Sequence, residues 1–413
     1  MRHRVADVYK AGVLAARLER FGGGTRFSYL PAYLAAGGAA VASSLPLTAE
    51  PVLSAAGAAP PYFTGLLPEG RRLNALRRSV KTSVDDELSL LIAAGANPVG
   101  DVQIVGHGET LDPDEHAVQL DPKTPVDFDA LLGDSGLIDP VALAGVQDKM
   151  SAGMISMPVA SAGRRFILKL NAPEFPHVVE NEFAMFRYAA RLRIPLSRVR
   201  LIRDVAGRPG LLVERFDRIP AAEYKRGGTP DAVQRLAVED GAQVLGLYPA
   251  DKYNVGYGQV CHALAAYCAA PLPALRNLAI QAAFAWLSGN GDLHAKNVSM
   301  VQQPSGEWSV APVYDIPSTV VYGDKTLALT LDGKRTGISR KHFLGWAAGL
   351  GLTDRAAVQV LELGLKASGP LLADLEAGTA FSSTNDGSAS PFPGMVTRNW
   401  VKELKHRRRL LEG

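Results

Sequence analysis

The sequence contains very little cysteine, which argues against a fold held by disulfide bonds. Cys261 and Cys268 are the two cysteines among 413 residues. Two thiols cannot form a disulfide framework, so this composition favours a reducing compartment, of which the cytoplasm is the simplest. The first residues, Met-Arg-His-Arg-Val-Ala-Asp, also lack the apolar core of a secretion signal. We therefore expect a cytoplasmic protein.

Long apolar runs and an excess of one charge are missing too. The uncharged stretch 28–49 is interrupted by Pro31, Pro46, Gly37 and Gly38, so we expect loops and short elements there rather than a membrane span. With 44 Lys and Arg against 41 Asp and Glu, the formal net charge of +3 gives no reason to expect nucleic-acid binding by the whole chain. Basic residues gather near the end, where we expect a solvated basic end of a last helix: Lys402, Lys405, His406, Arg407, Arg408 and Arg409.

The composition divides the chain into three parts, which are an N-terminal subdomain (1–106), a linker rich in Asp, Pro and Gly (107–140) and a core (141–413). In the first part, a helix is expected after Pro68. A second helix is expected over 85–92, because carboxylates occupy its first turn and Gly95 can end it. The alternation at 101–105 predicts a strand.

The beginning of the core, about 141–218, reads as a small β-rich lobe. Residues 165–170 predict a strand, and 180–193 predict a helix. The apolar side of that helix is expected to consist of Phe183, Phe186, Ala190 and Leu192. Two further strands, 199–203 and 211–216, flank a glycine-containing turn and predict a hairpin.

The rest of the core, about 219–413, reads as a mostly helical lobe. Residues 274–288 predict a long helix that ends at Gly289. Two short strands, 298–301 and 308–311, then predict a second hairpin. This hairpin would return the chain to the end of the long helix.

The residues around the second hairpin have the order of a phosphoryl-transfer site. Asp292 is followed five positions later by Asn297, and Asp315 follows the hairpin. The first carboxylate can accept a proton from an attacking hydroxyl, while the amide and the second carboxylate can hold Mg²⁺ against the phosphates of ATP. Alone, Asp292 would be a turn residue. With Lys296 able to meet phosphate charge, the set favours catalysis, and we expect His294 to brace the loop, because no second ligand at metal spacing accompanies it.

Lys169 lies within an apolar strand, where an ammonium group is costly unless it is paired or reaches solvent. The alternative is an exposed strand face. The functional interpretation is a lysine that contacts phosphate and is held by a carboxylate on the next helix. Glu182 is the preferred partner and Glu180 the second choice.

Two segments could complete a nucleotide site. The turn at 145–149 offers backbone amides and a cation to phosphates, although it matches neither a Walker loop nor the glycine-rich loop of ordinary protein kinases. Residues 214–216 could give adenine its backbone hydrogen bonds. The alternative for them is a strand edge with a surface ion pair.

Taken together, these segments resemble the HipA toxin kinases of bacterial type II toxin–antitoxin systems. The resemblance covers nearly the whole chain, through 44–47, 62–70, 95–105, 144–149, 213–218, 292–297, Tyr314 and Asp315. It implies an α+β fold with a bilobal kinase-like core, a small β-rich lobe and a mostly helical lobe, preceded by a small α/β subdomain. It also implies ATP and Mg²⁺ as cofactors.

The resemblance assigns roles position by position. Asp292 would be the catalytic base, and Asn297 and Asp315 would hold Mg²⁺. The remaining residues implied around the nucleotide are Ala144, Gly145, Val146, Gln147, Asp148, Lys149, Lys169, Glu182, Glu214, Arg215, Phe216, His294, Lys296 and Tyr314.

The family also implies partners. Its members are serine/threonine protein kinases that arrest growth by phosphorylating a cytosolic target, typically an aminoacyl-tRNA ligase, and a small DNA-binding antitoxin, HipB-like, restrains them. DNA would then be reached only through the antitoxin, and no membrane is expected. Members commonly carry an autophosphorylated serine before the nucleotide loop. The matching position here is Ala142, and the nearest serines are Ser135 and Ser151.

Two other functions stay open. A small-molecule kinase of the aminoglycoside or choline type has a similar loop around Asp292, but it has no counterpart of the first hundred residues and needs an acidic acceptor pocket. A catalytically silent kinase fold could act as a binding module for an antitoxin or DNA. Against that, every polar group expected at the site is present, whereas a silent kinase usually lacks at least one.

Overall fold

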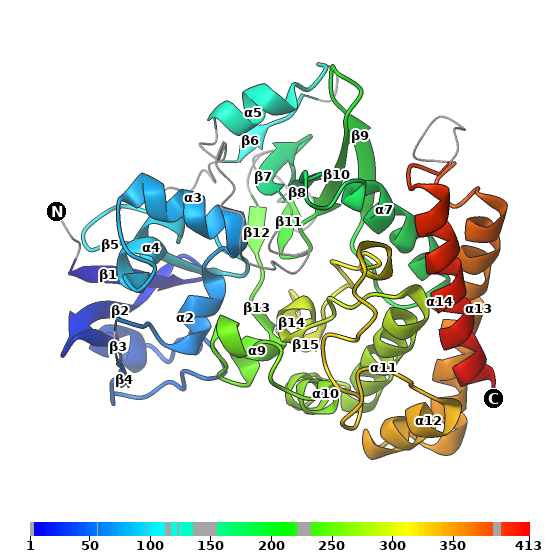
Figure 1. Ribbon diagram of the computed structural model, residues 1–413. Helices are drawn as coiled ribbons and strands as arrows, with labels where there is room; N and C mark the ends of the chain where they lie inside the picture. Colours follow the sequence, from blue (N-terminus) through cyan, green and yellow to red (C-terminus); the bar gives the residue numbers. More distant parts are fainter. Residues whose placement is uncertain are drawn as a thin grey trace. The chain divides into compact units, whose positions relative to one another are not determined.

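The computed structural model describes residues 4–55, 57–95, 97–111, 117–121, 124–134, 155–220, 233–382 and 390–413. The chain forms two compact units, each assembled from separate stretches of sequence. The first consists of Met1–Gln147, Pro158–Arg165 and Asp217–Asp251, and the second of Asp148–Met157, Phe166–Phe216 and Lys252–Gly413. Figure 1 colours the elements along the sequence.

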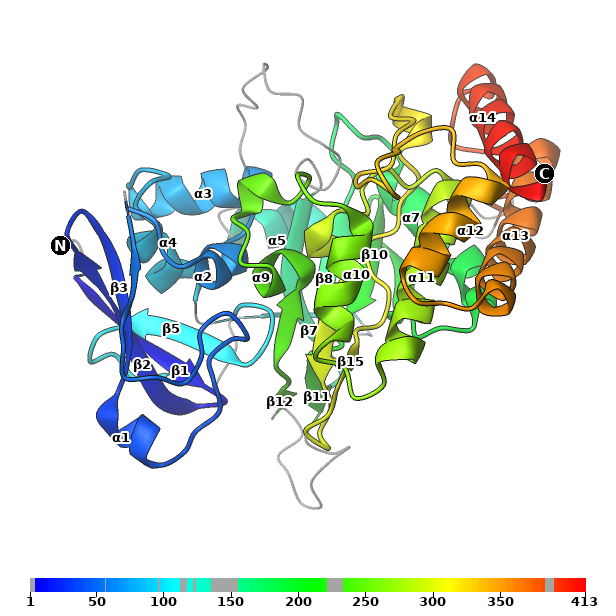
Figure 2. The same cartoon turned by 90° about the horizontal axis from the view of Figure 1, so that it is seen from below.

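The first unit is built on a five-stranded antiparallel sheet in the order β4-β3-β2-β1-β5. Its strands are β1 (Val5–Lys10), β2 (Val13–Phe21), β3 (Gly24–Tyr29), β4 (Val52–Ser54) and β5 (Val102–Gly106). Four helices accompany the sheet: α1 (Pro31–Ala35), α2 (Pro61–Leu66), α3 (Gly70–Val80) and α4 (Glu87–Ala94). Of these, α2, α3 and α4 lie together on one face of the sheet (Figures 1 and 2).

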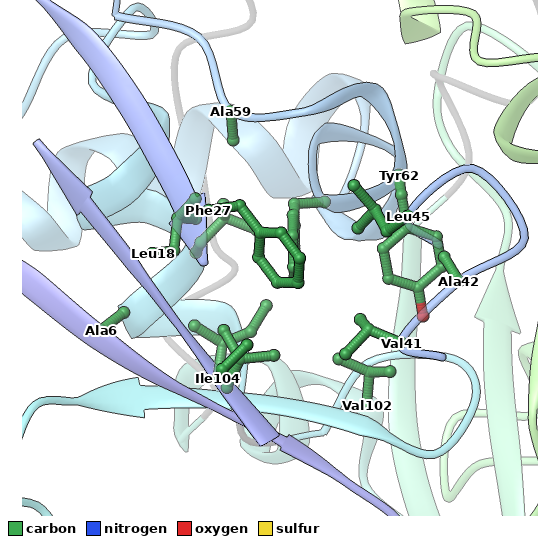
Figure 3. Packing of buried hydrophobic residues seen from close by; sticks show 14 of the residues in the cluster. Ala6, Leu18, Phe27, Val41, Ala42, Leu45, Ala59, Tyr62, Val102 and Ile104 are labelled. Atoms are coloured by element: carbon green, nitrogen blue, oxygen red, sulfur yellow. The ribbon is translucent and has the colours of Figure 1, made fainter. Parts of the chain in front are cut away.

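Alternation along the strands places apolar side chains on that face, where they form the core of the unit. Phe27 lies in the middle of this cluster (Figure 3) and its ring centroid is 5.4 Å from that of Phe63 on α2. Tyr62, also on α2, is almost completely buried. Burial of these large side chains is the main force that holds the helices on the sheet.

The elements expected here are present. A helix, α3, follows Pro68, and α4 and β5 match the predicted second helix and strand. Asp86 begins α4 by accepting a hydrogen bond from the Ser89 amide at 3.3 Å. The predicted linker, 107–140, contains more regular structure than its composition suggested, since its described part includes β6 (Val118–Gln119) and α5 (Phe128–Asp134).

The remaining elements of the first unit are short. They are the end of β7 (Ile155–Ser161), which pairs in parallel with β6, then β11 (Arg218–Pro220), β12 (Val233–Arg235), β13 (Val238–Asp240), α9 (Gly241–Val244) and η2 (Pro249–Asp251). Arg218 is buried and joins β11 to the loop before β5. Its guanidinium donates to the carbonyl oxygen of Gly100 at 2.9 Å and to the Asp217 carboxylate at 2.6 Å.

The second unit begins with antiparallel strands in the order β8-β10-β9: β8 (Arg164–Leu170), β9 (Val199–Arg203) and β10 (Pro209–Glu214). The helix α7 (Val178–Ala189), continued by η1 (Ala190–Leu192), packs on β9 and β10 through Val179 and Leu211. The predicted strand, helix and hairpin are therefore confirmed. Ala190 is exposed rather than on the apolar side, whereas the polar residues Glu180, Asn181 and Glu182 are buried.

Helices form the larger part of the second unit. They are α10 (Tyr257–Ala265), α11 (Pro271–Ser288), η3 (Ala295–Asn297), η4 (Val320–Tyr322), α12 (Arg340–Gly349), α13 (Asp354–Ala377) and α14 (Gly394–Glu412), with β14 (Ser299–Gln302) and β15 (Trp308–Val310) as a hairpin. The last two helices lie side by side (Figures 1 and 2). The long helix and hairpin expected from the sequence are present as α11 and β14–β15. Within the described ranges, none of the helices is both long and apolar enough to cross a membrane.

The expectation of a solvated basic end fails most clearly at Arg407 of α14, and Arg408 is partly buried as well. Arg407 is completely buried. Its guanidinium donates to the carbonyl oxygens of Trp286 at 3.1 Å and Lys325 at 2.7 Å, and it lies 4.5 Å from the centre of the Trp286 ring. The exposed residues Lys402, Lys405 and Arg409 follow the expectation.

Candidate active site

The end of α11 fixes the start of the loop that carries Asp292. Gly289 takes a left-handed backbone (φ 76°), and a Cβ atom there would come within 2.6 Å of Val320, so conformation and space both require glycine. Two asparagines then hold the loop. Asn290 Oδ1 accepts from the Asp292 amide, and Asn297 Nδ2 donates to the Asp292 carbonyl oxygen, each at 2.8 Å. These bonds fix the backbone on both sides of the Asp292 carboxylate, which is almost fully buried.

The hairpin returns the chain to this loop, as expected. The Tyr314 hydroxyl donates to the Lys296 carbonyl oxygen at 2.8 Å and also hydrogen-bonds Ser299 of β14. The next residue, Asp315, has a left-handed backbone (φ 55°), which is uncommon for a residue with a side chain. The structure therefore brings Asp315 to the loop of Asp292 and Asn297 from a separate stretch of sequence.

Lys169 on β8 makes the ion pair expected of it. Its Nζ lies 2.8 and 2.9 Å from the two carboxylate oxygens of Glu182 and 2.9 Å from Asp315 Oδ1. The second choice, Glu180, is not the partner, because its carboxylate accepts from Asn171 Nδ2 and contacts His177 Nδ1, each at 2.9 Å. Lys169 thus connects the helix α7 with the segment after the hairpin.

The three charges change one another's pKa values. Burial lowers the pKa of the Lys169 ammonium, but Asp315 and Glu182 outweigh this effect and raise it above its ordinary value. For Glu182, burial and the nearby Asp315 raise the pKa to about 7 despite the lysine. For Asp315, burial is outweighed by Lys169, with smaller contributions from His294 and Lys252, and its pKa is lowered. Lys169 therefore favours the ionised form of Asp315.

Sequence reasoning missed two residues that contact Asp292 or the loop that carries it. The Tyr253 hydroxyl lies 3.4 Å from Asp292 Oδ1, and its ring is 5.1 Å from that of His294, whose Nε2 is 3.9 Å from the same oxygen. Lys252 is buried, and its carbonyl oxygen accepts from the Ala295 amide at 3.2 Å. Neither residue belongs to a motif, so only the folded chain reveals their position. His294 accepts from the Lys296 amide at 3.2 Å, which agrees with the bracing role expected of it.

The donor atoms suit a hard divalent cation. Asn297 commits its Nδ2 to the Asp292 carbonyl oxygen, so its Oδ1 is the atom available for a metal. Together with the ionised Asp315 carboxylate, it offers two oxygen ligands, and Mg²⁺ characteristically binds few protein oxygens and completes its shell with phosphate and water. Clusters of three or more His, Cys, Asp or Glu side chains that could hold a metal are absent from the described ranges, so a dedicated protein cage is not found there.

The structure describes the proposed adenine segment but not the proposed phosphate loop. Glu214 ends β10, Arg215 is buried, and the Phe216 ring lies 5.7 Å from the ring of Tyr314. Phe216 therefore belongs to the same neighbourhood as Asp315. The expected phosphate loop (144–149), Ala142 and the two nearest serines, Ser135 and Ser151, lie outside the described residues.

Comparison with known proteins identifies the family. The model of the HipA N-terminal domain matches residues 6–105, and that of the HipA-like C-terminal domain matches residues 141–367, more than half of the chain. The chain belongs to the HipA family. This confirms the resemblance that the sequence motifs indicated.

Relatives cover most of the chain. A putative kinase of Sinorhizobium fredii, Y4mE, is 31% identical over 76% of this chain and 77% of its own length. The serine/threonine-protein kinase toxin HipA of Shewanella oneidensis is 28% identical over 66% of each chain. A solved HipA structure from that organism, in complex with HipB and operator DNA, covers 98% of this chain and 97% of its own with a TM-score of 0.75 at 20% identity. The predicted α+β, kinase-like fold is confirmed.

Proposed function

We propose that this HipA family member is an ATP- and Mg²⁺-dependent serine/threonine protein kinase. The observation that carries the proposal is the contact of the Lys169 ammonium with both Glu182 and Asp315. A lysine held by a helix carboxylate and placed beside a metal-binding aspartate is what protein kinases use to orient the phosphates of ATP. Membership of the HipA family supports the same reading.

Each residue of the site would have a separate role in phosphoryl transfer. Asp292 would accept the proton of the attacking hydroxyl group, and the two asparagine contacts to its backbone keep it oriented. Lys169 would contact the phosphates of ATP. Asn297 Oδ1 and the Asp315 carboxylate would hold Mg²⁺, which supplies positive charge against the phosphate oxygens. The ionised state of Asp315, which Lys169 favours, suits this task.

The residues around the nucleotide are assigned from the resemblance to HipA kinases. Residues 144–149 would cover the phosphates, and Glu214, Arg215 and Phe216 would line the adenine. The proximity of Phe216 to Tyr314 supports a place beside the metal-binding segment. Residues 1–106 would form the family's N-terminal subdomain and 141–413 the kinase core.

Partners follow from the family and belong to the proposal. The similar protein from Shewanella oneidensis is known in a complex with HipB and operator DNA. By analogy, we expect a small DNA-binding antitoxin as the partner of this chain, with DNA reached through it. The substrate would be a cytosolic protein, such as an aminoacyl-tRNA ligase, and its phosphorylation would arrest growth.

The test is phosphoryl transfer by the purified protein. Wild type, Asp292→Asn and the control Asp354→Asn, which changes an exposed carboxylate at the start of α13, are incubated with γ-labelled ATP, Mg²⁺ and cytosolic extract. We expect a discrete labelled protein with wild type and control, and none with Asp292→Asn. Transfer retained by Asp292→Asn would refute the assignment of the base. Label on small molecules alone would favour a small-molecule kinase, and no label from folded wild type would favour a binding module.

A further inference from the structure

Asn181 is a polar residue for which the proposed chemistry has no use, although it directly precedes Glu182 on α7. Its side chain is completely buried. Its Nδ2 donates to the carbonyl oxygen of Ser318 at 2.8 Å, and its Oδ1 accepts from the amide of the same residue at 3.0 Å. The amide side chain therefore pairs with the backbone of Ser318 through both of its polar groups, in the way two peptide groups pair in a sheet.

Ser318 belongs to the segment that follows Asp315, and this segment is also bound to the loop of the catalytic base. The next residue, Thr319, donates from its amide to the Gly289 carbonyl oxygen at 2.8 Å. Its hydroxyl accepts from the Gly291 amide at 2.9 Å. One short stretch of chain thus contacts α7 on one side and the beginning of the Asp292 loop on the other.

This arrangement connects α7, which carries Glu182, with the segment that follows Asp315 through a second route. The first route is direct, through the Lys169 ammonium between Glu182 and Asp315. The second consists of buried hydrogen bonds from Asn181 to Ser318 and from Thr319 to Gly289 and Gly291. Buried bonds of this kind hold their geometry firmly, because breaking one leaves a polar group without water.

The amide group is the side chain that suits this place. A carboxylate would lack the donor that Ser318 O requires and would bury a charge, and an apolar residue of similar size would satisfy neither backbone group. Glutamine is one carbon longer, and the site is fully enclosed. The chemistry of Asn181 is therefore matched to its partner rather than to general packing.

We propose that Asn181 is a positioning residue for Asp315: it holds the metal-binding segment against α7 and so keeps Lys169, Glu182 and Asp315 assembled before nucleotide binds. This inference rests on the proposed kinase function and adds a residue that determines how well the site accepts Mg²⁺.

The test replaces Asn181 and measures the Mg²⁺ requirement. Asn181→Leu keeps the approximate volume and removes both hydrogen bonds. The matched control is Tyr188→Phe, which removes a partly buried hydrogen bond of 2.8 Å from the same helix to Asp374 on α13. Three quantities are compared: the melting temperature, the Mg²⁺ concentration at half-maximal phosphoryl transfer, and the affinity for a fluorescent ATP analogue with and without Mg²⁺.

We expect both variants to lower the melting temperature, and Asn181→Leu alone to raise the half-maximal Mg²⁺ concentration, by about tenfold, the effect of losing roughly one net hydrogen bond. Its affinity for the analogue should fall with Mg²⁺ present and stay unchanged without Mg²⁺. A normal Mg²⁺ requirement in a destabilised Asn181→Leu protein would overturn the proposal and leave a structural residue.

Two measures keep the result interpretable. If Asn181→Leu does not fold, Asn181→Ser, which is smaller and polar, replaces it, with the same shift expected in the same direction. If folded wild type transfers no phosphate, the proposed kinase function fails, while the Mg²⁺ dependence of analogue binding still decides the role of Asn181. An unchanged dependence in both Asn181 variants would refute that role.

Discussion

Arg407→Met tests whether the last helix holds the end of α11 through a single buried cation. The guanidinium donates to the carbonyl oxygens of Trp286 and Lys325 and to the Glu403 carboxylate at 2.9 Å, and it lies over the Trp286 ring. Hydrogen bonds from a charged group contribute about 1.5–3 kcal/mol each, and a desolvated cation–π contact contributes about 2 kcal/mol. Methionine fills part of the space and removes the cost of burying the charge, so we expect a net loss of about 3 kcal/mol.

The assay is thermal unfolding, with Arg409→Met as the control. Arg409 lies two residues further along the same basic stretch, is exposed, and donates to the Lys405 carbonyl oxygen at a long 3.4 Å. For a unit of this size, about 3 kcal/mol corresponds to a fall of roughly 6–12 °C in melting temperature. The control should change stability by less than about 0.5 kcal/mol. Equal and small effects of the two substitutions would refute the reasoning, because they would mean that the buried guanidinium contributes no more than a solvated one.

Two further predictions concern charged groups. Lys169→Ala should lower ATP turnover by about 10²–10³-fold. The control Lys366→Ala, which removes an exposed lysine of α13, should leave ATP turnover unchanged. The fall in melting temperature should be small near pH 7 and should increase as the pH rises, because Glu182, with its pKa already raised to about 7, can take up a proton when the lysine is gone. An unfolded Lys169→Ala protein at pH 7 would favour a purely structural lysine. Burial raises the pKa of Asp86, but its hydrogen bonds, above all with Arg20, outweigh this effect and lower the pKa to about 2. The ionised Asp86 should therefore contribute about 1 kcal/mol to the free energy of unfolding. This contribution should be complete above pH 4 and should be lost between pH 4 and 2. Urea unfolding at pH 6 and pH 3 should therefore show a smaller change in the free energy of unfolding between the two pH values for Asp86→Asn than for wild type. An equal change in both proteins would contradict the role given to Asp86.

The sequence alone predicted the parts of the site that depend on local signals. A glycine after an apolar helical run indicated the end of α11 at Gly289, and two short apolar runs around a turn indicated the hairpin before Asp315. Lys169 stands out in the sequence because a lysine is unusual in an apolar strand. The prediction that Lys169 pairs with Glu182 rather than Glu180 is confirmed. The two glutamates differ because positions two residues apart point to different sides of a helix.

Residues whose role depends on distant partners were not predictable in this way. Arg407 stands in a basic stretch like its neighbours, and only the packing of α14 on the end of α11 buries it. Tyr253 reaches Asp292 from another loop, and Asn181 finds its partner on a segment far along the chain. No local pattern encodes such contacts, because they arise when separate elements pack against one another.

The Lys169 ammonium has three N–H groups, and within the described part of the chain its three hydrogen-bond partners are all carboxylate oxygens, two from Glu182 and one from Asp315. A phosphate oxygen could therefore approach this lysine only in exchange for one of them. A cation that bound the Asp315 carboxylate would free one N–H group of Lys169 for a phosphate oxygen. A phosphate that bound Lys169 would in turn free the Asp315 carboxylate for the cation. Metal and nucleotide would then strengthen each other's binding by the same factor, as thermodynamic linkage requires, so that each measured alone would bind this protein more weakly than the two measured together.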